Sequence, residues 1–220
     1  MSDLAGFVRD QLGHAPKDLA LFERALTHPS LGRDNYQRLE FLGDRVLALV
    51  IAEWLTERFQ GEAEGQLSFR LTTLVSRASC AQVGIELGVP ALLRLGKQAM
   101  DDGAARSENV VGDAVEALIA GLYLDGGYDA AKAFVRRNWA SMLDAQQTAP
   151  RHPKSLLLEW AEGHGRRPPD YEVIDQSGPP HAPRFTVRAA VRGLGSAEGK
   201  GSSKQEAETA AAAALLEQLQ

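Results

Sequence analysis

The sequence contains one cysteine, Cys80, so it cannot form an internal disulfide bond. A lone thiol is typical of proteins from a reducing compartment. We therefore expect a cytoplasmic protein in which Cys80 is a small buried apolar side chain. The sequence also lacks an apolar run near the roughly 20 residues that a helix needs to cross a bilayer. Its start contains acids and no basic stretch before an apolar one, unlike a secretory signal, so no membrane partner is expected.

A surplus of positive charge is missing as well. The chain has 24 Lys and Arg against 29 Asp and Glu, a net charge of −5. Because nucleic-acid-binding domains are usually basic, the overall composition argues against such a partner. The acidic surplus is regional, since residues 1–150 contain 15 basic and 20 acidic residues, whereas residues 151–220 contain nine of each. Binding to a polyanion would therefore depend on local patches, on metal ions, or on both.

Residues 1–145 are predicted to form an all-α domain. Apolar side chains recur near the helical period of 3.6 in four stretches, residues 39–59, 68–88, 109–123 and 129–145. A loop is expected between the second and third stretches, where the residues that break the pattern are Gly96, Asp101, Asp102 and Gly103.

Residues 146–152 lack large apolar side chains and predict a linker to a second domain, residues 153–220. The second domain starts with an expected helix behind Pro153 and ends with an alanine-rich helix over residues 203–219. Between them, period-two alternation near residues 171–173 and 185–191 predicts two strands, and residues 194–197 a third, shorter one. The order α-β-β-β-α indicates a small α+β domain.

Two pairs of acidic residues in the first domain carry the chemical signal. Glu40 and Asp44 are four residues apart, and Asp113 and Glu116 are three apart, so each pair lies on one face of a predicted helix. Acidic pairs at helical spacing are often only a solvated helix face. These pairs, however, are embedded in apolar sequence, where burying two acids is costly unless a cation neutralises them. Oxygen ligands suit magnesium or manganese.

Periodicity alone cannot show that the two helices meet, and it also permits a di-iron site in a helix bundle. Such sites add histidines at Glu-x-x-His spacing, which this sequence lacks. Zinc-binding Cys/His patterns, P-loops and serine-nucleophile motifs are missing too. If the four carboxylates converge, they would hold one or two divalent ions suited to an in-line phosphoryl displacement.

Four segments of the first domain resemble bacterial ribonuclease III, in order and in spacing. They are ALTHPS (residues 25–30), RLEFLGDRVL (38–47), EGQLSFRLTTLVS (64–76) and GDAVEALIAGLYLDGG (112–127). The resemblance covers essentially the whole chain, and it implies the ribonuclease III endonuclease fold for the first domain.

The resemblance implies that Glu40, Asp44, Asp113 and Glu116 bind Mg²⁺, with Mn²⁺ as a substitute, and that Asp44 and Glu116 are catalytic. A metal-activated water would cut double-stranded RNA, leaving 5′-phosphate and 3′-hydroxyl ends with short 3′ overhangs. The family acts as a homodimer with the helix that contains RLEFLGDRVL (residues 38–47), its signature segment, in the interface, and it processes ribosomal RNA precursors and messengers. Those properties are expected here.

Two residues depart from the family pattern. Gln37 stands where the family often has an acid, which would alter the rate or selectivity of cleavage if that acid positions RNA, although glutamine can still form hydrogen bonds. Arg45 stands where many members have a small residue, and it could pair with an acid or lie at the dimer surface. All four metal-site acids are present, so neither departure indicates an inactive enzyme.

Residues 153–220 resemble a double-stranded-RNA-binding domain, most closely in the segment 195–216. Gly199 and Gly201 would let the backbone approach a ligand. Ser203 is a candidate N-cap for the last helix, with Glu206 completing a capping box. The helix N-terminus favours phosphate, and the RNA-binding residues expected from the pattern and the resemblance are Glu159, His181, Lys200, Ser203 and Lys204.

Gln205 and Glu208 occupy places where such domains often have Lys or Arg, so this domain alone is expected to bind RNA weakly. Two rival functions fit the same residues. The chain could bind RNA duplexes without cutting them, or it could be a metal-dependent phosphatase for small substrates. The four acids favour a nuclease over a pure binder, and a phosphatase would leave the second domain without a purpose.

Overall fold

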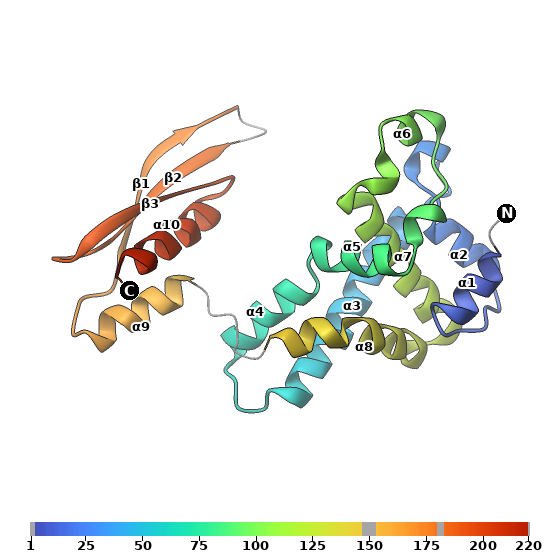
Figure 1. The fold of residues 1–220 in the computed structure, drawn as a ribbon, viewed down its shortest axis with the longest axis horizontal. Helices are drawn as coiled ribbons and strands as arrows, with labels where there is room; N and C mark the ends of the chain where they lie inside the picture. Colours follow the sequence, from blue (N-terminus) through green and yellow to red (C-terminus); the bar gives the residue numbers. More distant parts are fainter. Residues whose placement is uncertain (1–2, 147–152, 180–182, 220) are drawn as a thin grey trace. The chain divides into compact units, whose positions relative to one another are not determined.

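A computed structural model of the chain describes residues 3–146, 153–179 and 183–219. The chain divides into two compact units, residues 1–149 and 150–220, which Figure 1 shows in sequence colours. The division falls in the segment predicted as a linker, and most of that linker, residues 147–152, lies outside the described residues. No helix in the described ranges is long and apolar enough to span a bilayer.

The first unit is helical, as predicted. Its α-helices are α1 (Leu4–Asp10), α2 (Leu19–Ala25), α3 (Gln37–Arg58), α4 (Glu64–Leu74), α5 (Arg77–Glu86), α6 (Lys97–Asp101), α7 (Glu108–Gly126) and α8 (Tyr128–Ala145). Three single 3₁₀ turns, Pro29–Leu31, Val89–Ala91 and Ala104–Arg106, lie in the connections. The predicted loop before α7 therefore contains the short helix α6 and two of these turns.

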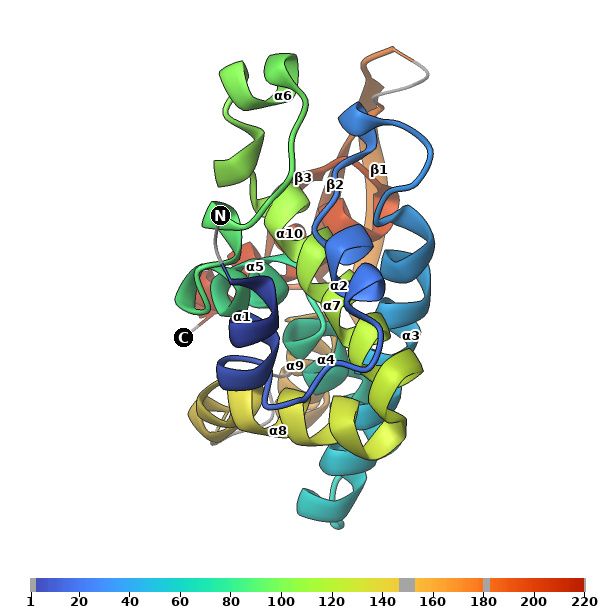
Figure 2. The ribbon, with the colours of Figure 1, turned by 90° about the vertical axis from the view of Figure 1, so that its right-hand side faces the viewer.

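The central element of this unit is α7, which packs against α2, α3, α5 and α8 (Figure 2). Its apolar side chains are buried on nearly every side, as expected for a helix that others surround. Helix α3 covers one flank of α7 and contributes Leu47, Val50 and Ile51 to the same core. The two helices that carry the acidic pairs are therefore direct neighbours.

A glycine sets how closely α3 and α7 approach. A Cβ atom added at Gly43 would lie 1.7 Å from the backbone oxygen of Glu116, so the two main chains touch at this point. Any other residue would push the helices apart. Because Glu40 lies one turn before Gly43 on α3, the crossing brings it beside the acidic face of α7.

The far end of α7 is fastened to the chain between α1 and α2. The Asp125 carboxylate accepts hydrogen bonds from the backbone N–H groups of Lys17 (2.9 Å) and Asp18 (2.8 Å). It also lies 2.5 Å from Nε2 of His14. These hydrogen bonds hold the pKa of Asp125 below its usual value, against the opposing effect of burial.

Residues 68–88 do not form one continuous helical stretch, which corrects the sequence prediction. The chain breaks between α4 and α5, where the Ser76 side chain accepts a hydrogen bond from the N–H of Ser79 (3.2 Å) and caps α5. The indole of Trp139 donates to the backbone oxygen of Leu74 (2.8 Å) at the end of α4. A cap and a distant tryptophan thus end the helix within an uninterrupted apolar pattern.

The second unit has the predicted order α-β-β-β-α. Its elements are α9 (Pro153–Gly163), β1 (Asp170–Ser177), β2 (Arg184–Val191), β3 (Gly195–Gly201) and α10 (Lys204–Leu219). The antiparallel sheet has the order β1-β2-β3, with a bulge between Val173 and Asp175. Strand β3 is longer than the predicted segment 194–197, because its glycines pair with β2 rather than ending the strand.

The glycines of β3 serve packing rather than the approach of a ligand, which corrects the interpretation of Gly199 and Gly201. A Cβ added at Gly199 would lie 2.1 Å from the backbone nitrogen of Ala211, and one at Gly201 would lie 2.6 Å from that of Ala207. Helix α10 therefore occupies the space above both residues. Its alanines are buried against the sheet, which explains why this helix is rich in alanine.

Candidate metal and RNA-binding sites

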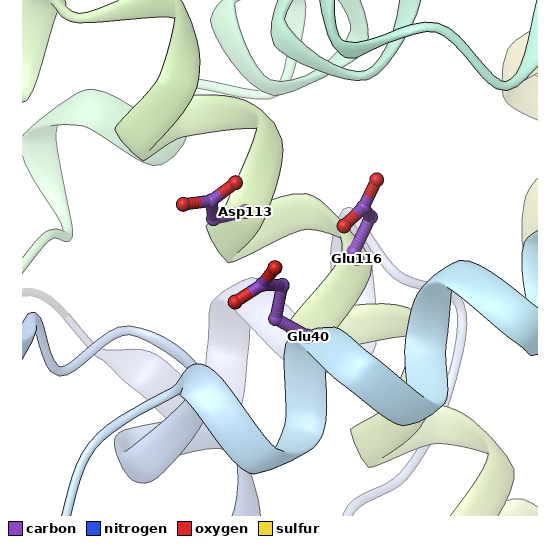
Figure 3. Close-up of side chains that lie close together, drawn as sticks. All are labelled: Glu40, Asp113 and Glu116. Carbon is purple, nitrogen blue, oxygen red and sulfur yellow. The ribbon is translucent and has the colours of Figure 1, made fainter. Parts of the chain in front are cut away.

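Three of the four predicted metal-site acids converge between α3 and α7. Glu40 extends from α3, Asp113 and Glu116 extend from successive turns of α7, and the three carboxylates lie close together (Figure 3). One carboxylate oxygen from each residue lies within 4.8 Å of the others. The described residues thus contain a compact set of oxygen ligands, formed by two helices that the sequence separates by about 70 positions.

Asp44, the fourth predicted ligand, is not a member of this group. It lies one turn after Glu40 on α3, and its partly exposed carboxylate pairs with the neighbouring Arg45. The Arg45 guanidinium also lies over the ring of Phe41, 5.4 Å from its centroid. Pairing with an acid was one of the two roles that the sequence left open for Arg45.

Burial and mutual repulsion make the cluster costly to charge. The Glu116 residue is 8% exposed. Its burial, together with the negative charges of Asp113 and Glu40, raises the pKa of its carboxyl from 4.5 to about 7. Burial also raises the pKa values of Glu40 and Asp113. Such a cluster has a strong electrostatic preference for a cation.

The observed ligand set fits a hard divalent cation. The Oδ1 atom of Asp113 is buried and has no hydrogen-bond partner, a costly arrangement that a bound cation would relieve. All three converging groups are carboxylates, the ligands that Mg²⁺ and Mn²⁺ prefer. The Glu40, Asp113 and Glu116 side chains are therefore suited to hold such an ion.

Three further residues surround the cluster, and sequence reasoning assigned none of them to the site. The Cys80 thiol is buried as expected, but it also donates a weak hydrogen bond to Oε1 of Glu116 at 3.9 Å. Burial and the Glu116 charge raise the pKa of Cys80, so it remains a thiol. Burial and the charges of Asp113 and Glu40 likewise raise the pKa of the Tyr36 hydroxyl. The third residue is Arg77, whose guanidinium lies 3.5 Å from Oδ1 of Asp113.

The predicted RNA-binding residues near α10 are exposed and lie close together along the chain. Lys200 is on β3, and Ser203 and Lys204 stand where α10 begins. Ser203 Oγ accepts a hydrogen bond from the backbone N–H of Glu206 at 3.2 Å, as expected of an N-cap. The Glu206 carboxylate, however, accepts from the backbone N–H (2.7 Å) and the hydroxyl (2.6 Å) of Ser202, so the predicted capping box is displaced by one residue.

The structure describes only one of the two remaining residues that were predicted to contact RNA. Glu159 is exposed on α9, whereas His181 lies outside the described residues. Glu208, which stands where basic residues are common, forms an ion pair with Lys154 of α9 at 2.6 Å. That acid therefore contributes to the packing of α9 on α10.

Comparisons with known proteins agree with this division of the chain. A family model described as "Ribonuclease-III-like" matches residues 18–143, and one described as "Double-stranded RNA binding motif" matches residues 153–219. The chain is 56% identical over 211 residues to Ribonuclease 3 of Zymomonas mobilis, covering 96% of this chain and 86% of that relative. It is 46% identical over 219 residues to Ribonuclease 3 of Caulobacter vibrioides, covering 96% and 94% respectively.

Solved structures are similar to the first unit. One is the nuclease domain of ribonuclease III from Campylobacter jejuni, with a TM-score of 0.61 and 32% identity over 64% of this chain and 97% of that one. A second structure of that nuclease domain concerns structural flexibility in the region involved in dimer formation. It has a TM-score of 0.60 and 33% identity over 61% of this chain and 95% of that one.

Proposed function

Since this chain belongs to the ribonuclease III family and is an endoribonuclease with a double-stranded-RNA-binding domain, we propose that its carboxylate cluster holds the divalent ions used to cut RNA duplexes. The convergence of Glu40, Asp113 and Glu116, with a buried Asp113 oxygen that accepts no hydrogen bond, supports this assignment best. A Mg²⁺ or Mn²⁺ ion there would supply an activated water and neutralise charge on the phosphate.

The residues of the cluster have distinct tasks in this proposal. Glu40 and Asp113 supply oxygens from the two facing helices, and Glu116 is the most buried of the three acids. Asp44 joins the set as the fourth acid and as a catalytic residue with Glu116. To do so its carboxylate must leave Arg45, which is possible because both side chains reach solvent.

Hydrolysis with attack on phosphorus and departure of the 3′ oxygen gives 5′-phosphate and 3′-hydroxyl products. The acids on α3 and α7 fix where the scissile phosphate must lie. The natural substrates proposed here are precursors of ribosomal RNA and structured messengers, as the family resemblance implies.

The second unit would place the duplex through contacts that do not read sequence. Lys200 and Lys204 flank the start of α10, where the positive pole of the helix favours phosphate. Glu159 on α9 is assigned to the wide minor groove of the duplex, where 2′-hydroxyl groups are accessible. His181 lies outside the described residues, and its proposed contact with the minor groove rests on the family resemblance alone.

We also propose that the chain acts as a homodimer through α3. Phe41 and Leu49 on this helix are 68% and 58% exposed, which is unusual for large apolar side chains. A second copy of the same face would cover them, and each copy would then cut one strand of the duplex.

The decisive experiment incubates the full chain with long duplex RNA and Mg²⁺, beside the Glu116→Gln variant. The wild-type chain is expected to cut the duplex, and the variant to bind it with similar affinity and leave it intact. Glu108→Gln is the matched control, because Glu108 is an exposed acid in the first turn of the same helix. Binding without cutting by the wild-type chain in Mg²⁺ would instead support a pure RNA-binding protein, and uncut duplex with the control would show a non-specific charge effect.

A further inference from the structure

Arg77 contacts the cluster from a third helix, α5. Its guanidinium lies 3.5 Å from Oδ1 of Asp113, the buried oxygen that has no hydrogen-bond partner. The Arg77 side chain is 51% exposed, whereas the Asp113 side chain is only 18% exposed. The arginine therefore reaches the cluster from its solvent side and retains room to move away.

The local backbone favours this contact at an electrostatic cost to α5. Arg77 is the first residue of that helix, where a positive charge faces the positive pole of the helix dipole. Its stem has space because residue 112 is glycine: a Cβ there would lie 3.1 Å from Cγ of Arg77. The Arg77 charge is thus unfavourable for its own helix, α5, but it is attracted by the negative charge of Asp113 on α7.

Arg77 acts on the whole cluster electrostatically. Its positive charge opposes the effect of burial by lowering the pKa values of Glu40, Asp113 and Glu116. A divalent ion bound to these carboxylates would have the same effect, more strongly. The guanidinium and such an ion would therefore compete for one oxygen of Asp113.

We propose that Arg77 is an internal counter-cation that competes with the divalent metal for Asp113 and so sets the metal concentration at which the site fills. The inference rests on the proposed metal site and adds a residue that tunes it. In the metal-free chain the guanidinium neutralises part of the cluster. When a divalent ion binds, its greater charge displaces the guanidinium, whose exposed end moves into solvent.

The test measures Mn²⁺ binding to the full chain by calorimetry, without RNA. Arg77→Met retains the length of the stem that passes Gly112 but removes the charge, and we expect Mn²⁺ to bind about five-fold more tightly. Arg77→Lys retains the charge and should stay close to wild type. Arg58→Met is the matched control, because Arg58 is 49% exposed and pairs with Asp144 at 2.7 Å, at the other end of α3.

The possible results separate this inference from the proposed function. Unchanged or weaker Mn²⁺ binding by Arg77→Met would overturn the role of Arg77 as a competitor. If Arg58→Met tightened Mn²⁺ binding equally, the effect would come from net charge alone, and the proposed competition by Arg77 would be overturned as well. The metal site itself is tested by Glu116→Gln in the same series. If that variant and the wild-type chain bind Mn²⁺ equally, the proposed metal site fails, whatever Arg77 does.

Discussion

Glu116→Gln should stabilise the metal-free protein while it abolishes cleavage. Burial raises the pKa of the Glu116 carboxyl from its ordinary value of 4.5 to about 7 in the folded chain. Each pKa unit corresponds to about 1.4 kcal/mol, so charging this buried group costs the folded state up to about 3 kcal/mol. Glutamine occupies almost the same volume without the charge, and it removes that cost.

The pH dependence has a definite sign. The folded chain binds the proton of the Glu116 carboxyl more tightly than the unfolded chain does. Protonated Glu116 therefore stabilises the folded state fully below pH 4.5, and this stabilisation is lost as the pH rises through about 7. The raised pKa values of Glu40 and Asp113 act in the same direction. Metal-free wild-type protein should therefore unfold more easily at pH 8 than at pH 5, and Glu116→Gln should weaken this dependence.

Differential scanning calorimetry in a chelator at pH 5 and pH 8 measures the effect. A change of 3 kcal/mol corresponds to a shift of roughly 6–12 °C in the melting temperature of a chain of this size. Excess Mg²⁺ should stabilise the wild-type chain more than the variant, because in the proposed site the ion would bind the folded state through this carboxylate. Glu108→Gln, the exposed control on α7, should leave the melting temperature unchanged. If Glu116→Gln melts at or below the wild-type temperature at pH 8 without metal, the buried charge is not the cost inferred here.

Other perturbations test the remaining parts of the structure. Replacing Lys200 and Lys204 by alanine should make log K for duplex binding less salt-dependent, with a slope shallower by about 1.8, as filter binding can measure; an unchanged slope removes both from the interface. Leu49→Arg should convert a dimer to monomers in sedimentation velocity, and a persisting dimer would place the interface elsewhere. Asp125→Asn weakens a buried acceptor of two backbone N–H groups and should cost about 2 kcal/mol in thermal unfolding, whereas a neutral result would mean that α7 is held without it. Mn²⁺ affinity should rise as the pH increases toward 7, because Glu116 must lose its proton to bind metal, and calorimetry showing a flat profile would exclude it as a ligand.

The sequence was sufficient to predict the order of helices and strands in both units, but not the points at which a helix breaks. Apolar periodicity alone predicts the long helices, because burial on one face is what it records. The break between α4 and α5 depends on the Ser76 cap and on Trp139, more than 60 residues away, whose indole binds the Leu74 carbonyl. The glycines of β3 were misinterpreted because the same residue permits both a ligand and a packed helix to come close.

The carboxylate cluster was predictable where its acids lie in adjacent helical turns. The spacing of the acids, together with the family resemblance, indicated four residues, of which the structure brings Glu40, Asp113 and Glu116 together and leaves Asp44 outside the group. Arg77 and Cys80 could not be assigned, because their relation to the cluster arises only from the packing of α5 on α7. No local pattern marks an arginine or a cysteine as the neighbour of an acid some 36 residues away.

Direct main-chain contact at Gly43 makes the spacing of the two acid-bearing helices independent of the side chains around them. Core side chains around this crossing could therefore be exchanged for others of similar size while the carboxylates of Glu40, Asp113 and Glu116 stay close together. A methyl group at position 43 cannot be accommodated in this way, because it would meet the backbone of Glu116 and not a side chain that could be shortened. We therefore expect this glycine to be among the least replaceable positions of the nuclease domain, although it takes no part in the chemistry.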